Sequence, residues 1–281
     1  MGATVALIGV GKMGRALLHL LNAAGHNVRA YDIAEEPMET ARSLGAVTTN
    51  CSREAAEGSA FVHVFVHNDH EVFDATLGDD GVLMGAAAGT IVLLHSTILP
   101  GTTKRVAEAA AGRDIDVIDA SVTAVPRRFQ AGEAIFLLGG PEGTVARARA
   151  HLEPLGREVC HFGPLGSGNT AKIAKNLTNA VERVMLAESV RIAEAAGLDV
   201  AQFLNMARDA HTGAMIEDWE RFIRIEDGHA GPARARGLFS KDIQHAARLG
   251  RDLGLDLPVT QSTADTALRL LAAWARADEA K

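Results

Sequence analysis

The stretch Thr4-Val5-Ala6-Leu7-Ile8-Gly9-Val10-Gly11-Lys12-Met13-Gly14 decides the fold of this chain. It joins an apolar run to three glycines spaced GxGxxG, and a segment of helical periodicity follows, from Met13 to Ala24, ending at Gly25. A strand that turns into a helix through such glycines is typical of a dinucleotide-binding unit. The first glycine permits the tight turn, the second lets a pyrophosphate approach the backbone at the helix N-terminus, and the third allows close packing of helix on strand.

The residues after the second predicted strand indicate which dinucleotide binds. Asp32 follows Tyr31 about 20 residues beyond the glycines, where an acid accepts hydrogen bonds from the adenosine ribose. A carboxylate there repels a 2′-phosphate, the next two residues, Ile33 and Ala34, are not arginine, and the acids Glu35-Glu36 follow. The sequence therefore predicts NAD rather than NADP, with Tyr31 and Asp32 in the cofactor site. The alternative is that Asp32 only caps the following helix.

Short apolar runs alternate with helical stretches from Ala3 to about Gly163, which is typical of a parallel sheet covered on both faces. The expected strands are Thr4–Gly9, Val28–Tyr31, Phe61–Val66, Ile91–His95, Asp116–Ala120, Ala134–Gly139 and Glu158–Phe162. After Gly166 we expect helices at Asn169–Ala196, Val200–Arg208, Met215–Ile225, Leu238–Leu253 and Thr260–Ala277. The sequence therefore predicts an α/β fold. A Rossmann domain with a doubly wound, mostly parallel sheet occupies residues 1–165, and a long helix joins it to an all-helical domain, residues 166–281.

Composition limits the possible partners and location. The chain has 281 residues, 47% hydrophobic and 22% charged, and its net charge of −7 comes from scattered acids, which disfavours a nucleic-acid partner. Cys51 and Cys160 form no CxxC pair, so we expect a reducing compartment and no metal framework. No run approaches 18 apolar residues and the N-terminus has no basic leader, so we expect no membrane span and a cytoplasmic location.

A second pattern, Gly166-Ser167-Gly168-Asn169-Thr170-Ala171-Lys172-Ile173-Ala174-Lys175-Asn176, opens the long helix. Lys172 and Asn176 lie one turn apart, so they project from the same helix face. An amine and an amide placed in this way can hold an alcohol or carbonyl oxygen, which hydride transfer to a cofactor requires. The alternative for a helix lysine is a solvated surface position. The pattern predicts a dehydrogenase with Lys172 and Asn176 as its catalytic residues.

Four motifs in order resemble those of the β-hydroxyacid dehydrogenase family, which includes 3-hydroxyisobutyrate dehydrogenase and, more distantly, 6-phosphogluconate dehydrogenase. They are Gly9–Gly14, His95-Ser96-Thr97-Ile98-Leu99-Pro100, Asp119–Gly132 and Gly166–Asn176, with Lys241-Asp242 as a weaker fifth. The resemblance covers nearly the whole chain. It implies an NAD-dependent enzyme that interconverts a small β-hydroxy acid, or a close analogue, with its semialdehyde or ketone. It also implies a homodimer or homotetramer.

The resemblance assigns roles to particular residues. Lys172 would exchange a proton with the substrate oxygen, and Asn176 would orient the substrate or the lysine. Thr97 would contact the nicotinamide end of the cofactor, and Val66-His67 occupy the analogous position after the preceding strand, because ligands bind beyond the carboxyl ends of parallel strands. Lys241 would reach across to the cofactor.

The segment Asp119–Pro126 departs from the family, whose usual DAPVSGG sequence binds the substrate carboxylate. Thr123 can replace the serine hydroxyl, but Ala124-Val125 stand where the family has glycines, and Pro126 removes an amide donor. Arg127-Arg128 follow and can bind an anion through forked hydrogen bonds, or they can be surface residues. The expected substrate contacts besides Lys172 and Asn176 are Ser96, Thr123, Ala124, Val125, Arg127 and Arg128.

Three alternatives remain open from the sequence. The Ala124-Val125-Pro126 segment also resembles imine reductases, a related group that usually has tyrosine or aspartate in place of the helix lysine and usually prefers NADPH. Lys172 and Asp32 argue against this alternative. A catalytically silent NAD(H)-sensing protein can use the same fold. A metal site among His63, His67, His70 and His95 has only the spacing of two histidines in its favour, and we predict no metal.

Overall fold

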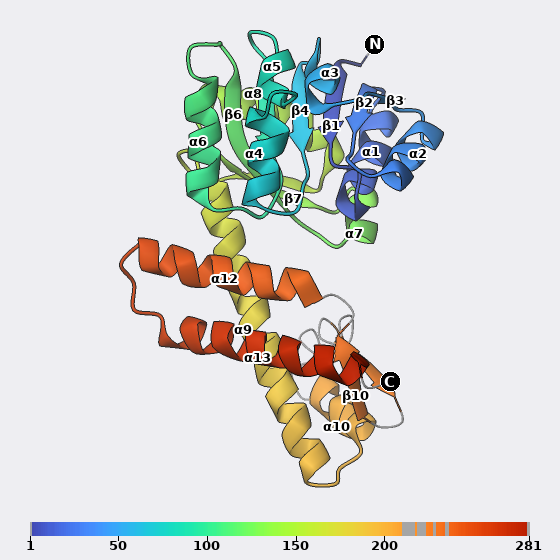
Figure 1. Ribbon diagram of the computed structural model, residues 1–281, viewed down its shortest axis with the longest axis vertical. Coiled ribbons are helices and arrows are strands. Elements are labelled where there is room, and N and C mark those ends of the chain that lie inside the picture. The colour runs from blue at the N-terminus through green and yellow to red at the C-terminus, as the bar shows by residue number, and fades with distance from the viewer. Residues whose placement is uncertain (1, 210–216, 218–222, 227–228, 234–235, 280–281) are drawn as a thin grey trace. The chain divides into compact units, whose positions relative to one another are not determined.

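The computed structural model describes residues 2–209, 217, 223–226, 229–233 and 236–279 (Figure 1). The chain divides into two compact units, Met1–Lys172 and Ile173–Lys281. The first unit contains an eight-stranded sheet with its helices, and the second contains helices and a two-stranded hairpin. The long helix α9, Ser167–Ala195, begins in the first unit and continues into the second.

The sheet of the first unit has the order β3-β2-β1-β4-β5-β6-β7-β8, and every neighbouring pair is parallel except β6 with β7. Its strands are β1 (Thr4–Ile8), β2 (Asn27–Tyr31), β3 (Val47–Thr48), β4 (Phe61–Val64), β5 (Ile91–Leu94), β6 (Asp116–Thr123), β7 (Ile135–Gly139) and β8 (Glu158–His161). The chain fills one side of β1 and then returns to fill the other, which is the predicted doubly wound topology. The α/β fold class is therefore confirmed, although the short edge strand β3 was not predicted and β6 extends further, to Thr123.

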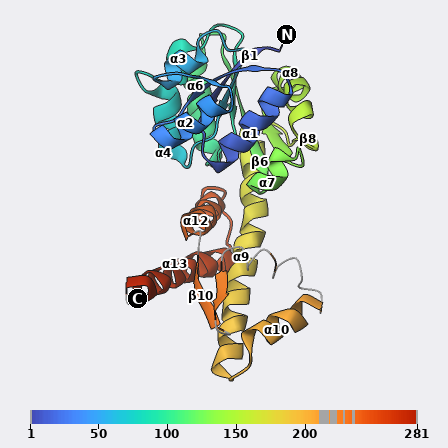
Figure 2. The ribbon, with the colours of Figure 1, turned by 90° about the vertical axis from the view of Figure 1, so that its right-hand side faces the viewer.

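Alternate residues of each strand enter two separate apolar cores. In β1, Val5 and Leu7 belong to one core and Ala6 and Ile8 to the other, because successive side chains of a strand point to opposite faces. Figure 1 and Figure 2 show helices on both faces of the sheet. The first core is covered by α1 (Lys12–Ala23), α7 (Pro126–Gln130) and α8 (Glu142–Leu152), and the second by α3 (Ser52–Ala56), α4 (Asp69–Leu77), α5 (Val82–Gly85) and α6 (Pro100–Ala110). The helix α2 (Glu35–Ser43) follows β2, and the short turn η1 (Glu153–Leu155) follows α8.

In the second unit, two helices pack on the middle of α9. The predicted helices are present as α10 (Val200–Ala207), α12 (Arg236–Asp252) and α13 (Pro258–Glu279). A small apolar cluster joins α9, α12 and α13 through Val184, Ile243 and Ala267. Within the described ranges, no helix has the unbroken apolar stretch that crossing a lipid bilayer demands.

One local prediction in the second unit is wrong. The strands β9 (Ile223–Glu226) and β10 (His229–Ala233) form an antiparallel hairpin where a helix was expected at Met215–Ile225. Most of that expected helix, residues 215, 216 and 218–222, lies outside the described residues. The sequence alternates Ile-Arg-Ile-Glu in β9 and then has Asp227-Gly228, a pattern typical of a hairpin.

Candidate functional site

The turn between β1 and α1 separates glycines that the fold requires from one that it does not. A Cβ on Gly9, whose φ is +90°, would lie 2.3 Å from the Phe65 carbonyl oxygen, and one on Gly14 would lie 2.0 Å from the Gly9 oxygen. At Gly11, apart from the glycine itself and its two chain neighbours, no heavy atom of the described residues lies within 4 Å of the position a Cβ would take. Gly11 is also the N-cap of α1, where no side chain caps the helix. The turn therefore leaves open backbone at a helix N-terminus, which fits the pyrophosphate of a dinucleotide.

The side chains of this turn are arranged around that opening. Lys12 is exposed, Met13 is half-buried against the first core, and Val10 is buried. The backbone N–H of Val10 donates to Asp32 Oδ2 at 2.7 Å, so the turn is tied to the end of β2.

Asp32 closes the turn rather than capping the helix that follows. Its second oxygen, Oδ1, accepts from the Ala34 backbone at 3.0 Å. The N-cap of α2 is Ala34, and no side chain caps that helix. Asp32 and its neighbour Tyr31 are both partly exposed, so the carboxylate is accessible at the mouth of the turn.

The ends of β4 and β5 are joined by one hydroxyl. Ser96 is buried, and its Oγ accepts from the Val66 N–H at 3.0 Å and donates to the Val66 carbonyl at 2.7 Å. A serine oxygen has two lone pairs, so one remains for another donor. Thr97 is half-buried beside it, and His67 is exposed, with its backbone N–H donating to Glu71 Oε2 at 2.9 Å. The structure thus brings Val66, Ser96 and Thr97 together at the carboxyl edge of the sheet.

A buried carboxylate holds the start of α9. Asp119 lies inside β6 and accepts from the Gly166 N–H at 2.7 Å and the Asn169 N–H at 2.8 Å. Burial raises the pKa of Asp119, and the hydrogen bonds from these N–H groups oppose that rise. An acid at this end of a helix also meets the positive end of the helix dipole.

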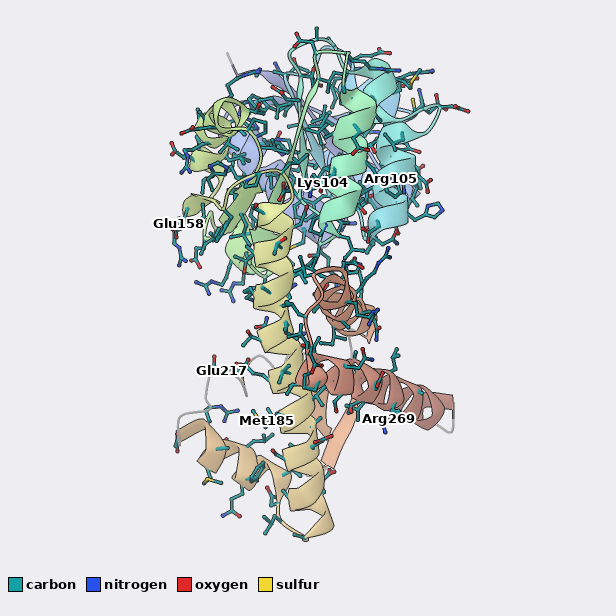
Figure 3. All side chains as sticks on the ribbon, turned by 90° about the vertical axis from the view of Figure 1, so that its left-hand side faces the viewer. Lys104, Arg105, Glu158, Met185, Glu217 and Arg269 are labelled. Atoms are coloured by element: carbon teal, nitrogen blue, oxygen red, sulfur yellow. The ribbon has the colours of Figure 1, made fainter. Side chains whose placement is uncertain are left out.

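The Asn169 side chain extends the same network. Its Oδ1 accepts from Thr103 Oγ1 on α6 at 2.7 Å, and its Nδ2 donates to Ser121 Oγ on β6 at 3.3 Å. Figure 3 labels Lys104 on α6, whose Cε lies 3.7 Å from the position a Cβ would take on Gly166. The first turn of α9 is therefore fixed by contacts with both β6 and α6, and Lys172 lies one turn further along.

Lys172 and Asn176 lie on α9 as predicted, one helical turn apart, with Lys172 half-buried and Asn176 buried. In the second unit, Asn176 Nδ2 donates to Asp242 Oδ2 at 2.9 Å. Lys241 Nζ lies 3.8 Å from Asp242 Oδ1. The structure therefore brings Asn176, Lys241 and Asp242 into one polar group.

The predicted anion-binding arginines lie on the exposed side of α7. Thr123 and Ala124 are half-buried and Val125 is exposed. Arg127 and Arg128 are both exposed, and Arg128 Nε donates to Glu133 Oε2 at 2.7 Å. The next residue, Phe129, is fully buried, and α7 packs against α1.

Two of the histidines considered as metal ligands belong instead to a buried chain of rings. His63 Nδ1 lies 2.8 Å from His95 Nε2, His63 Nε2 lies 2.9 Å from His151 Nε2, and His95 Nδ1 lies 2.7 Å from the Ala120 carbonyl oxygen. Burial lowers the pKa of His95 to about 4 and that of His151 to about 3, and it places the pKa of His63 well below its usual value. His67 and His70 lie apart from this chain, beside Glu71 and Asp74.

In the part of the chain that the structure describes, no three histidine, cysteine or acidic residues are grouped to hold a metal ion. The histidine chain joins β4, the end of β5 and α8, and it is held by ring stacking, with Phe61 3.9 Å from His151 and Phe65 5.1 Å from His95 between ring centroids. It is therefore an internal, neutral polar network.

Comparisons with known proteins match both parts of the chain. Residues 4–163 match a family model described as the NAD binding domain of 6-phosphogluconate dehydrogenase. Residues 166–280 match one described as NAD-binding of NADP-dependent 3-hydroxyisobutyrate dehydrogenase. A 3-hydroxyisobutyrate dehydrogenase of Pseudomonas aeruginosa is 30% identical, over 85% of this chain and 82% of that protein. The chain belongs to the β-hydroxyacid dehydrogenase family.

Membership confirms the predicted family, the prediction of an NAD-dependent enzyme and NAD as its cofactor. An NAD-dependent L-serine dehydrogenase of Pseudomonas aeruginosa is 28% identical, over 93% of this chain and 87% of that protein. The solved structure of a Mycobacterium tuberculosis 3-hydroxyisobutyrate dehydrogenase with L-serine has a TM-score of 0.81 at 26% identity, covering 97% of this chain and 94% of that one. An imine reductase from Myxococcus stipitatus has a TM-score of 0.66 at 20% identity, over 97% of this chain and 95% of that one, and shares the fold.

The sequence analysis missed the residues that position the first turn of α9 and the histidine chain. Asp119 was read only as the start of a substrate segment, and the links of Asn169 with Thr103 and Ser121 were not anticipated. The signal in the sequence was weak, because Asp119 and Asn169 belong to separate motifs that are about 50 residues apart. His151 gave no signal at all, since no local pattern connects it with His63.

Proposed function

We propose that this member of the β-hydroxyacid dehydrogenase family interconverts a small β-hydroxy acid, or a close analogue, with its semialdehyde or ketone, and that Lys172 is the general acid and base. The observation that carries this proposal is the placement of Lys172 and Asn176 one turn apart on a helix whose first turn Asp119 fixes. A group that transfers a proton must be held in position, and a buried anchor near the start of its helix supplies that.

Each residue has a defined part in the proposed reaction. During oxidation Lys172 Nζ takes the proton of the substrate hydroxyl, and during reduction it returns that proton to the carbonyl oxygen. Asp242 as a carboxylate only accepts hydrogen bonds, so the Asn176 amide turns its nitrogen to Asp242 and leaves Oδ1 to accept from a substrate hydroxyl or from an ammonium. When bound, the nicotinamide accepts or supplies the hydride.

The names of two relatives support the proposed substrate class. One acts on 3-hydroxyisobutyrate and another on L-serine by name, and both compounds carry a hydroxymethyl group on the carbon next to a carboxylate. We infer the same arrangement for this substrate. The exposed cations Arg127 and Arg128 support recognition of a carboxylate. The other proposed substrate contacts are Ser96, Thr123, Ala124 and Val125.

The cofactor contacts belong to the same proposal. Gly9 to Gly14, Tyr31 and Asp32 would hold the adenosine and pyrophosphate parts, and the open backbone at Gly11 supports this assignment. Thr97 and Val66-His67 would adjoin the nicotinamide end. Lys241 would contact the cofactor, with Asp242 beside it.

Three broader expectations are retained as proposals. The free state of both cysteines, Cys51 and Cys160, supports a reducing, cytoplasmic location. Large apolar side chains that are about half exposed on the second unit, such as Met185 and Leu268, support a homodimer or homotetramer. The boundary between the Rossmann domain and the second domain is proposed to lie between residues 165 and 166.

The test is the variant Lys172→Ala with Lys175→Ala as its control, since Lys175 is exposed on the same helix. Reduction of NAD is followed with 3-hydroxyisobutyrate, L-serine and related acids. We expect Lys172→Ala to lower kcat by about 10²–10⁴-fold, the usual contribution of a general acid or base, while its Kd for NADH stays unchanged. Lys175→Ala should retain kcat within about twofold of the unaltered protein.

Other outcomes would contradict the proposal. A Lys172→Ala variant with kcat within tenfold of the unaltered protein would remove the lysine from the chemistry. If the unaltered protein binds NADH and reduces cyclic imines but oxidises no hydroxy acid, the imine reductase alternative holds. If it binds NADH and turns over neither class, the sensor alternative holds.

A further inference from the structure

No arginine follows Asp32 directly in the sequence, but the fold places one, Arg15, near Asp32. Arg15 lies in the first turn of α1, directly after the third glycine. Its Nε donates to the Val10 carbonyl at 3.1 Å, and the N–H of the same Val10 donates to Asp32 at 2.7 Å. The guanidinium and the Asp32 carboxylate are therefore fixed to the two polar groups of one residue.

The NH2 end of this guanidinium, which lies away from Val10, pairs with an acid from α2. Arg15 NH2 forms an ion pair with Glu36 Oε2, and Thr40 Oγ1 lies 3.4 Å from the other oxygen, Glu36 Oε1. The Arg15 side chain is 32% exposed and that of Glu36 70% exposed, so a bound molecule can reach the pair. Glu36 thus both adds a negative charge near Asp32 and neutralises the cation there.

The chemistry of the two nicotinamide cofactors makes this arrangement consequential. NADP differs from NAD by a 2′-phosphate on the adenosine ribose, which is the ribose that the acid after β2 binds. Arginine is the preferred partner of a phosphate, because its planar fork donates two hydrogen bonds at once. An arginine held at this ribose by the Val10 carbonyl would favour NADP unless its remaining nitrogens were engaged.

We propose that Glu36 is a specificity-determining residue that favours NAD over NADP by engaging Arg15. Asp32 repels the 2′-phosphate directly, and Glu36 engages Arg15, a cation that would otherwise attract it. Two carboxylates then discriminate NAD from NADP, Asp32 by repelling the phosphate and Glu36 by engaging Arg15. This inference concerns the adenosine end of the cofactor and does not depend on the identity of the substrate or on Lys172.

The competing interpretation is a surface ion pair that merely joins α1 to α2. Exposed pairs of this kind contribute little to stability, so both interpretations allow a nearly unchanged melting temperature. They differ in cofactor binding, because only the specificity role changes the affinity for a molecule that carries the 2′-phosphate.

The test measures Kd for NADH and NADPH by nicotinamide fluorescence, without turnover, on the unaltered protein and on Glu36→Gln, Glu35→Gln, Arg15→Gln and the double variant Arg15→Gln/Glu36→Gln. Glu35→Gln is the matched control, since it removes the same charge from the same turn of α2. We expect Glu36→Gln to bind NADPH about fivefold or more tightly relative to NADH, and Glu35→Gln to change that ratio less than twofold. In the Arg15→Gln background, adding Glu36→Gln should leave the ratio within about twofold.

Three results would overturn the inference. A gain for Glu36→Gln that persists without Arg15 would mean direct repulsion of the phosphate by Glu36. An equal gain for Glu35→Gln would mean a general charge effect, and no gain for Glu36→Gln would leave only the ion pair between helices. NADH binding by each variant shows that its fold and cofactor site are intact, so these outcomes are independent of the proposed reaction.

Discussion

The cofactor turn, Gly9–Gly14, and the substrate segment, Asp119–Arg128, differ in how the backbone constrains their residues. In the turn, a positive φ at Gly9 and a backbone oxygen 2.0 Å from any Cβ on Gly14 exclude every residue except glycine. In the segment, Ala124 and Val125 stand where the family has glycines, and Val125 has an ordinary φ of −86°. The comparison teaches that backbone geometry requires a glycine at Gly9 and Gly14, whereas at Gly11 and in the substrate segment the backbone accommodates a side chain.

The largest expected effect comes from adding one carbon to the turn. Gly14→Ala should destabilise the protein by about 3 kcal/mol, because its Cβ would overlap the Gly9 carbonyl and force α1 away from β1. Gly11→Ala should leave the free energy of unfolding within about 0.5 kcal/mol, because its φ of −65° suits alanine, and weaken NADH binding about tenfold or more. Urea denaturation and NADH fluorescence measure the two quantities.

These two variants can break the comparison. If Gly14→Ala unfolds at the urea concentration of the unaltered protein, backbone geometry does not dictate the third glycine. If Gly11→Ala binds NADH as tightly as the unaltered protein, the open position beside α1 does not receive the pyrophosphate.

The next effect concerns the inner half of the substrate segment, where His95 is bonded to the Ala120 carbonyl. Burial lowers the pKa of His95 to about 4 and of His151 to about 3, whereas an unfolded chain has histidine pKa values near 6.5. The unfolded state therefore binds more protons below about pH 6.5, and stability falls as the pH falls. For His95 the loss between pH 6.5 and pH 5 is about 2 kcal/mol.

Replacing one ring sharpens this test. The variant His151→Gln keeps a donor toward His63 but cannot be protonated, so the slope of the unfolding free energy against pH between 6 and 4.5 should decrease by about one proton. His70→Gln is the control, because His70 is exposed and pairs with Asp74. His26, whose ring centroid lies 4.9 Å from that of His151, remains in both variants. An unchanged slope in His151→Gln would mean that the ring is already charged in the folded protein.

The smallest effect is expected at the outer end of the segment. Arg127→Ala should raise KM for the hydroxy acid about tenfold with kcat unchanged, as loss of one charged hydrogen bond to a carboxylate predicts. Arg128→Ala should change KM about twofold, because Arg128 is engaged by Glu133. Steady-state kinetics decide, and equal KM values for both variants and the unaltered protein would place both arginines outside the site.

Local sequence patterns were enough to predict most of the fold and to propose the cofactor residues. The glycines and Asp32 lie within one strand–helix–strand unit, so spacing alone predicts their arrangement. Apolar runs predicted every strand of the eight-stranded sheet except the two-residue strand β3. The hairpin β9–β10 was missed because its alternating sequence was read as helical.

Contacts between distant segments could not be predicted in the same way. The Arg15–Glu36 pair, the Asp119 anchor of α9 and the three-histidine chain each depend on how strands and helices are ordered in the sheet. Spacing along the chain does not determine which side chains meet across such distances, because many strand orders satisfy the same local pattern.

The three-histidine chain also fixes which nitrogen of each ring carries hydrogen. The Ala120 carbonyl only accepts, so His95 must donate from Nδ1 and accept at Nε2; His63 then donates from Nδ1 and accepts at Nε2, and His151 donates from Nε2. Any reversed tautomer would set two donors or two lone pairs against each other. A single peptide oxygen on β6 thus dictates the tautomer of a ring on α8, and nitrogen NMR of the imidazoles would display one pattern.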